Sequence, residues 1–242
     1  MLKEAKQNKM KINIRNLLKY FDTRTSTVYG DTTAVMSVVG EDLGATLFKH
    51  YCENERKSKV EIVDPNEEIP TEGKKIGRRL DRWILEKTKN NLVLYQAEIK
   101  SWSSRAIGGI TIPVDISEEE LRKKIKQNWN RNVALMNDKR VNGLNKVLVE
   151  MPTDKKLDEL GINGPYNKAP LLIFWDARNS KGDTDCFSKY NIKKKQHNFN
   201  YCWIFSCSLY LRHLHKKGIK DLQIVIPNAE RRINRLNSLF KV

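Results

Sequence analysis

The sequence predicts an α/β domain in which a mixed β-sheet lies between layers of helices. Two observations lead to this fold class. Short runs rich in β-branched and aromatic residues alternate with longer segments that carry apolar residues at helical spacing. One short run, residues 92–100, begins apolar on both faces, as expected of a central strand in a sheet covered on both sides. A chain of 242 residues can bury a sizeable core, and we expect a single three-layer domain over residues 29–242.

A basic segment, residues 1–28, precedes this domain. It carries seven basic side chains and two acidic ones, together with apolar residues at helical spacing. These apolar residues are Ile12, Ile14, Leu17, Leu18 and Phe21. The pattern indicates a short amphipathic helix, which either contacts a partner as an arm or packs against the body of the domain.

The next expected element is a helix within residues 35–51. Leu43, Leu47, Phe48 and Tyr51 recur at helical spacing, and the small residues of "GA" at positions 44–45 fall on the same side. Small residues allow close approach, so we expect this helix to lie tightly against a flat surface.

Three strands are expected next, over residues 59–63, 76–87 and 92–100, with "TKNN" joining the last two as a hairpin. A two-residue turn at Lys89–Asn90, with Asn90 tolerating positive φ, would pair Thr88 with Asn91. Facing residue numbers then sum to 179. The sequence therefore predicts that Asp81 lies directly opposite Glu98.

The strongest helix pattern covers residues 117–138. Ser117 and Glu120 have the spacing of a capping box at its start. One face is apolar, with Leu121, Ile125, Trp129, Val133 and Met136. The opposite face is basic, with Arg122, Lys123, Lys126 and Arg131.

Five further segments complete the predicted domain. They are strands over 146–151 and 170–175, a helix over 200–218 that ends at Gly218, a strand over 221–227 and a helix over 229–240. The order of elements is that of a mixed sheet flanked by helices.

Composition limits the possible partners and compartment. Lysine and arginine outnumber aspartate and glutamate 45 to 29, giving a formal net charge of +16. This charge predicts a polyanionic partner, and the alternative is a solvated basic surface without one. No stretch has the length of a membrane helix and the first residues resemble no signal peptide, so we expect a soluble, cytoplasmic protein with four reduced cysteines.

The predicted hairpin places two carboxylates at the end of a central strand. Facing positions in a sheet have Cβ atoms roughly 4.5 to 5.5 Å apart, so Asp81 and Glu98 would repel each other there. A divalent cation between them would turn this repulsion into binding, and Mg²⁺ prefers such hard oxygen ligands. Lys100, two residues after Glu98, adds an ammonium beside the pair.

These residues resemble the PD-(D/E)xK nuclease superfamily. "RLDRW" followed by "QAEIK" matches its motif, although Leu80 stands where the motif has proline. The resemblance covers about residues 38–150 and implies a restriction-endonuclease-like core of αβββαβ order. It also implies that Asp81, Glu98 and the carbonyl of Ile99 hold Mg²⁺, for which Mn²⁺ can substitute, while Lys100 orients or activates the attacking water.

The superfamily often adds a glutamate from the helix before the sheet. Glu41 takes this place by resemblance, both as a metal ligand and as a catalytic residue, whereas Asp42, about 100° further round the helix, is expected to point away. The implied reaction is hydrolysis of phosphodiester bonds in double-stranded DNA that leaves 5′-phosphates. The implied protein is an endonuclease like the type II restriction enzymes, which generally act as homodimers.

Basic side chains near this site are candidate DNA contacts. They are Lys74, Lys75, Arg78, Arg79, Arg105, Arg122, Lys123, Lys126 and Arg131, with Gln127 as a polar contact. Phosphate contacts of this kind set the position of DNA rather than its sequence. For each group the alternative is an ordinary solvated charged surface.

Three other interpretations stay open. A repair, transposon-associated or RNA-directed nuclease would share the fold. A non-catalytic binding module would keep Asp81 and Glu98 as salt bridges to Lys100 or Arg79. An RNA-associated structural protein would explain the charge but not the opposed carboxylates.

Some remaining polar residues carry weaker signals. Cys202, Cys207, His213 and His215 lack zinc-site spacing, and the cysteines lie in an apolar stretch that predicts a buried helix. Asp176 follows a predicted strand and receives no role.

Overall fold

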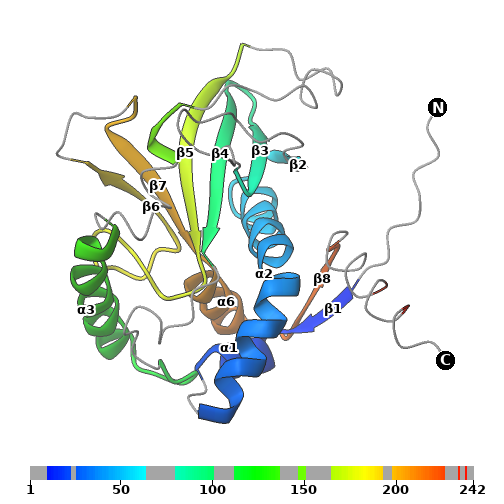
Figure 1. Cartoon of the computed structure of the whole chain (residues 1–242), viewed down its shortest axis with the longest axis vertical. Coiled ribbons are helices and arrows are strands. Elements are labelled where there is room, and N and C mark those ends of the chain that lie inside the picture. Colours follow the sequence, from blue (N-terminus) through cyan, green and yellow to red (C-terminus); the bar gives the residue numbers. More distant parts are fainter. Residues whose placement is uncertain are drawn as a thin grey trace.

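The main body of the protein is a six-stranded mixed sheet (Figure 1). The computed structural model describes residues 10–22, 26–63, 80–100, 112–136, 147–150, 165–192 and 198–226, with residues 234 and 238. In spatial order the strands are β2 (Lys59–Val63), β3 (Arg82–Lys87), β4 (Leu92–Lys100), β5 (Asn167–Phe174), β7 (Tyr201–Ser206) and β6 (Phe187–Asn191). The predicted α/β class and the mixed sheet are confirmed.

Strand directions divide the sheet into two parts. β2, β3 and β4 form an antiparallel meander, whereas β4, β5 and β7 run parallel to one another, and β6 returns antiparallel at the edge. β4 is therefore an internal strand, as its two apolar faces predict. Its bounds match the predicted 92–100.

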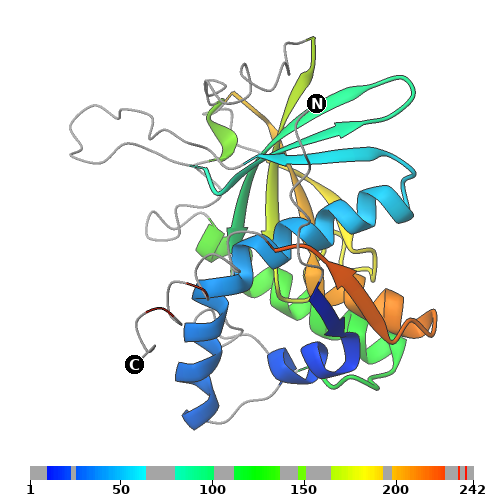
Figure 2. The same cartoon turned by 90° about the vertical axis from the view of Figure 1, so that its right-hand side faces the viewer.

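Helices cover both faces of this sheet. They are α1 (Ile14–Asp22), α2 (Ser26–Asn54), α3 (Glu118–Met136) and α6 (Cys207–Lys216). One core cluster joins buried residues of α1, α2 and α6 to Tyr95, Ala97 and Ile99 of β4. A second cluster, on the other face, joins Leu94 of β4 to Trp129 of α3. Period-2 alternation along β4 thus separates the two cores of a three-layer arrangement (Figures 1 and 2).

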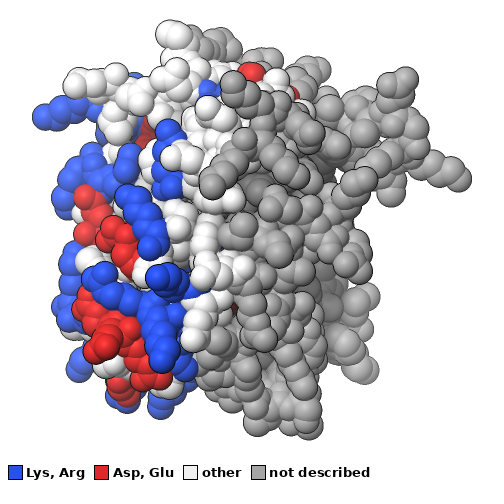
Figure 3. All heavy atoms as spheres, turned by 90° about the vertical axis from the view of Figure 1, so that its left-hand side faces the viewer, with Lys and Arg blue, Asp and Glu red and all other residues white. Residues whose placement is uncertain are grey.

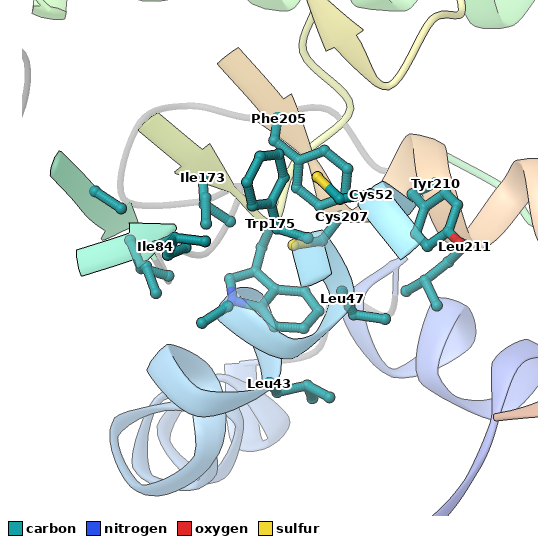
Figure 4. Packing of buried hydrophobic residues seen from close by; sticks show 14 of the residues in the cluster. Leu43, Leu47, Cys52, Ile84, Ile173, Trp175, Phe205, Cys207, Tyr210 and Leu211 are labelled. Carbon is teal, nitrogen blue, oxygen red and sulfur yellow. The ribbon is translucent and has the colours of Figure 1, made fainter. Parts of the chain in front are cut away.

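The helix α2 lies close against the sheet, as its small residues predict. A Cβ added at Gly44 would stand 3.0 Å from Cγ2 of Ile99 and 3.4 Å from Cγ2 of Ile173. The Trp175 indole fills the space beside it, between α2 and the strands (Figure 4). Glycine is needed here for close approach rather than for backbone conformation.

The N-terminal segment packs on the body of the domain. β1 (Met10–Asn13) pairs with β8 (Asp221–Ile224) to form a separate two-stranded sheet. The next residues enter α1, where Ile14 and Leu18 are fully buried in the larger core cluster. Residues 1–28 were expected either to contact a partner as an arm or to pack against the body of the domain. The described residues of this segment support packing against the body.

Several predicted elements differ from those observed. The segment 200–218 is not one helix, because β7 occupies its first part and α6 begins only at Cys207, although Gly218 ends α6 with φ of 77° as predicted. Val147 and Leu148 form a helical turn rather than a strand. β6 was not predicted at all. The predicted residues 76–79 and most of 229–240 lie outside the described residues.

One physical boundary explains the main difference. Ser206 ends β7 and caps α6 by accepting a hydrogen bond from the backbone N–H of Leu209, so the chain changes conformation inside a mostly apolar run.

Among the described helices, none is long and apolar enough to cross a membrane.

Candidate active site

The site is built on the β3–β4 hairpin, whose register follows the predicted sum. The N–H of Thr88 donates to the carbonyl of Asn91 at 2.9 Å, and Arg82 pairs with Ala97 at the other end. Continuing this register by one residue beyond the paired positions would bring Asp81 opposite Glu98. Asn90 does not use positive φ, since Lys57 is the one non-glycine residue with positive φ in the described chain.

Asp81 immediately precedes Arg82, the first residue of β3. Its Oδ2 accepts a hydrogen bond of 2.6 Å from the backbone N–H of Ile99. The N–H and C=O of one strand residue point to the same neighbouring strand. The carboxylate of Asp81 is therefore beside the Glu98–Ile99 peptide, on the side to which the Ile99 carbonyl points.

Glu98 is held on the sheet face that also carries Leu94 and Gln96. Its side chain is buried, with 5% exposure. The Gln96 amide donates to the carbonyls of Val147 and Val149, which ties this face of β4 to the following chain segment. The backbone of Lys100 pairs with Phe174, while its side chain lies outside the described structure.

Arg82 connects α2 to the backbone of Asp81. Its guanidinium donates to the carboxylates of Glu41, at 3.3 Å, and Asp42, at 2.6 Å, and to the carbonyl of Asp81. Asp42 is 4% exposed, so the prediction that it points away from the site region is wrong. The long arginine side chain explains the difference, because it reaches α2 at both positions.

The basic face of α3 is exposed, but its charges are mixed. Arg122, Lys123, Lys126 and Gln127 are all exposed, and Arg122 pairs with Glu118 at 3.1 Å. Figure 3 shows basic and acidic side chains side by side on this side of the molecule. The side chain of Arg131 and the whole of Lys74, Lys75, Arg78, Arg79 and Arg105 lie outside the described residues.

Comparisons with protein-family models, with curated proteins and with solved structures found no significant match. Any chemistry assigned to this chain therefore depends on its own geometry.

The donor set at the hairpin suits a hard cation only in part. The carboxylates of Asp81 and Glu98 and the Ile99 carbonyl, at the same end of the hairpin, are ligands of the kind that Mg²⁺ takes. Within the described ranges, no three acidic, histidine or cysteine side chains come together as a metal-binding group. A cation at Asp81 and Glu98 would thus complete its coordination with the Ile99 carbonyl, water and substrate oxygens.

Among the described residues, Cys202, Cys207, His213 and His215 do not form a metal-binding group. Cys202 lies in β7 and Cys207 begins α6, both at 0% exposure, and burial raises the pKa of both thiols. The two histidines lie in the last turn of α6 as predicted.

Sequence reasoning missed two arginines near the hairpin. Arg82 stands inside the quoted "RLDRW" and is buried, and Arg178 follows β5 and is also buried. A basic residue directly after a motif aspartate was the available signal for Arg82. The sequence around Arg178 offered none, because an arginine in a polar loop is ordinarily exposed.

Proposed function

We propose that this protein is a magnesium-dependent endonuclease that hydrolyses phosphodiester bonds in double-stranded DNA, and that it resembles the type II restriction enzymes. The observation that supports this proposal is the hydrogen bond of 2.6 Å from the Ile99 N–H to the Asp81 carboxylate, which lies beside the Glu98–Ile99 peptide of a central hairpin. The chain order α2, β2, β3, β4, α3, β5 also agrees with the αβββαβ core that the motif implies.

The residues of the hairpin would have separate roles in this reaction. Asp81, Glu98 and the Ile99 carbonyl would hold Mg²⁺, which supplies charge neutralisation at the scissile phosphate and a lower pKa for bound water. Arg82 would keep the Asp81 backbone in place, since it bonds that carbonyl and two carboxylates of α2. Lys100 would orient the attacking water or stabilise the developing negative charge.

The test is incubation of the protein with long duplex DNA, with and without Mg²⁺. We expect cleavage that requires the metal, with 5′-phosphate ends, and we expect Lys100→Ala to abolish cleavage while DNA binding is largely kept. Branched DNA and RNA serve as parallel substrates, because a repair or RNA-directed nuclease would prefer one of them. Undiminished cutting by Lys100→Ala would contradict the assignment.

DNA binding and dimer formation belong to the same proposal. A net charge of +16 and the exposed basic side chains of α3 favour phosphate contacts, and a two-fold dimer would match a palindromic site. Affinity should fall with salt, with a log–log slope of about 0.9 for each phosphate neutralised. Salt-insensitive binding would argue against this surface.

One observation favours a second candidate, a nucleic-acid-binding module that does not cleave. The Asp81 carboxylate already serves the fold by accepting the last N–H of the hairpin ladder. Binding that is indifferent to Mg²⁺, without cleavage of any of the three substrates, would favour this candidate.

A further inference from the structure

Arg178 is a buried cation whose hydrogen-bonding capacity is only partly used. Its side chain is 1% exposed, and its Nη2 donates to Asp176 at 3.0 Å. Among the described residues, its Nε and Nη1 have no hydrogen-bond partner. Leaving donors of a buried charged group unpaired is costly, so such donors ordinarily have a hydrogen-bond partner.

The location of Arg178 connects it to the candidate active site. Its guanidinium carbon lies 4.3 Å from the centre of the Phe174 ring. Phe174 is the register partner of Lys100, and Leu172 is the partner of Glu98. Leu172 and Phe174 belong to the same core cluster as Leu94, whose face of β4 also carries Glu98. Arg178 therefore lies on the Glu98 face, roughly 7 Å further along the strands.

The loop that carries Arg178 is firmly attached. The Ser206 hydroxyl donates to the carbonyl of Asp176 and accepts from the N–H of Arg178, and the N–H of Ser208 donates to the carbonyl of Trp175. Because β7 and α6 meet at Ser206, the loop is fixed to rigid elements. A side chain held in this way is suited to orient a ligand.

We propose that Arg178 is a substrate-binding residue that donates hydrogen bonds from one edge of its guanidinium, formed by Nη2 together with Nε or Nη1, to the non-bridging oxygens of a DNA phosphate next to the scissile bond. This proposal rests on the proposed nuclease function and deepens it. The planar guanidinium presents paired donors that match phosphate geometry. Burial lowers the pKa of Arg178 more than the neighbouring Asp176 raises it, so a second anion would stabilise the charge. Since only 1% of the side chain is exposed, the packing around the guanidinium must open when the phosphate binds.

Duplex DNA binding at several salt concentrations, measured without Mg²⁺, tests this role independently of cleavage. We expect Arg178→Met to lower affinity by roughly 10-fold or more and to reduce the log–log salt slope by about 0.9. Arg178→Lys keeps the charge, so it should keep the slope but lose affinity, because an ammonium lacks the planar fork. Thermal unfolding of each variant checks that the protein is folded.

The matched control is Lys11→Met, which removes one positive charge at an exposed position on β1 that pairs with Asp221. If Arg178→Met, folded, binds DNA with the same affinity and slope as Lys11→Met, Arg178 has only a structural role and the proposal fails. In that case cleavage by the wild-type protein would still support the nuclease. Conversely, Arg178-dependent binding without cleavage on any substrate would keep the phosphate contact and overturn the nuclease.

Discussion

Asp81 combines a structural and a proposed chemical role in one side chain. It accepts the N–H of Ile99 where the hairpin ladder ends, so the same carboxylate lies beside the Glu98–Ile99 peptide. The register that brings these residues together could be predicted because a two-residue turn fixes every facing pair along a hairpin. The hydrogen bond from Arg82 to Asp42 could not be predicted, because helical spacing along α2 does not show how far an arginine side chain of the sheet reaches.

Asp81→Asn should separate the two roles. The asparagine side-chain oxygen can still accept the Ile99 N–H, so stability should change by less than about 1 kcal/mol, whereas the lost charge should abolish Mg²⁺-dependent cleavage. Asp81→Ala should lose both the hydrogen bond from Ile99 and Mg²⁺-dependent cleavage, with a stability cost of about 1 kcal/mol. Urea unfolding and plasmid cleavage measure the two effects. Full cleavage by a folded Asp81→Asn would exclude the carboxylate from the chemistry.

Gly44 tests the closeness of α2 to the sheet. Alanine normally stabilises a helix interior relative to glycine, but here its Cβ would stand 3.0 Å from Cγ2 of Ile99. We expect Gly44→Ala to destabilise the protein by about 1 kcal/mol, because overpacking outweighs helix propensity. The cost should shrink when Ile99→Leu removes Cγ2, and a double-mutant cycle by urea unfolding measures this coupling.

At the scale of elements, the junction of β7 and α6 depends on one hydroxyl. Ser206 caps α6 and also bonds the loop residues Asp176 and Arg178. Ser206→Ala should cost about 2 to 3 kcal/mol, because a cap is lost and a buried carbonyl loses its donor. Ser117→Ala, which removes the simpler exposed cap of α3, is the control and should cost about 1 kcal/mol. Equal costs in chemical unfolding would contradict the shared role.

A buried ionic network joins β3 to the loop before β2. Glu86, 1% exposed, accepts hydrogen bonds from Arg56, Ser58 and Tyr95. Burial alone would raise the pKa of Glu86, but these hydrogen bonds and the Arg56 charge outweigh it, so the pKa lies below its ordinary value of 4.5. The ionised form is thus favoured by folding.

The network should make stability depend on pH. A carboxyl whose pKa is lowered in the folded state contributes stability above pH 4.5, and this contribution is lost as pH falls through the folded pKa. Wild-type protein should therefore lose more stability below pH 4.5 than Glu86→Gln. Urea unfolding between pH 6 and 3 measures the difference, and Glu61→Gln, at an exposed position of β2, should follow the wild type.

The elements that sequence patterns predicted well have a clear period or a clear boundary. α3 has both an apolar stripe and a serine cap, and β4 is bounded by a turn. The part of the segment around the junction, residues 201–211, is mostly apolar, so neither period 2 nor period 3.6 stands out there, and the change at Ser206 is hidden. β6 escaped prediction because an edge strand of five residues in a polar stretch carries little pattern.

At the scale of the whole molecule, the cysteine thiols should react slowly in the folded protein. All four are free; Cys52, Cys202 and Cys207 are buried and Cys186 is partly buried, and burial raises the pKa of each thiol. Few thiolates exist at pH 8, so a disulfide reagent should label the native protein slowly and all four thiols after denaturation. Reductant should leave the melting temperature unchanged. Rapid labelling of a native thiol would contradict this.

The two-stranded sheet ties together segments from opposite ends of the described chain. Asn13 and Asp221, bonded through their side chains, are 208 residues apart in sequence. During translation, β1 must therefore wait until the residues of β8 have left the ribosome before it gains its partner. Ile14 and Leu18 belong to α1, which packs on α6, so these fully buried side chains gain that packing only after residues 207–216 have been synthesised. Until then the nascent chain offers chaperones an apolar binding segment.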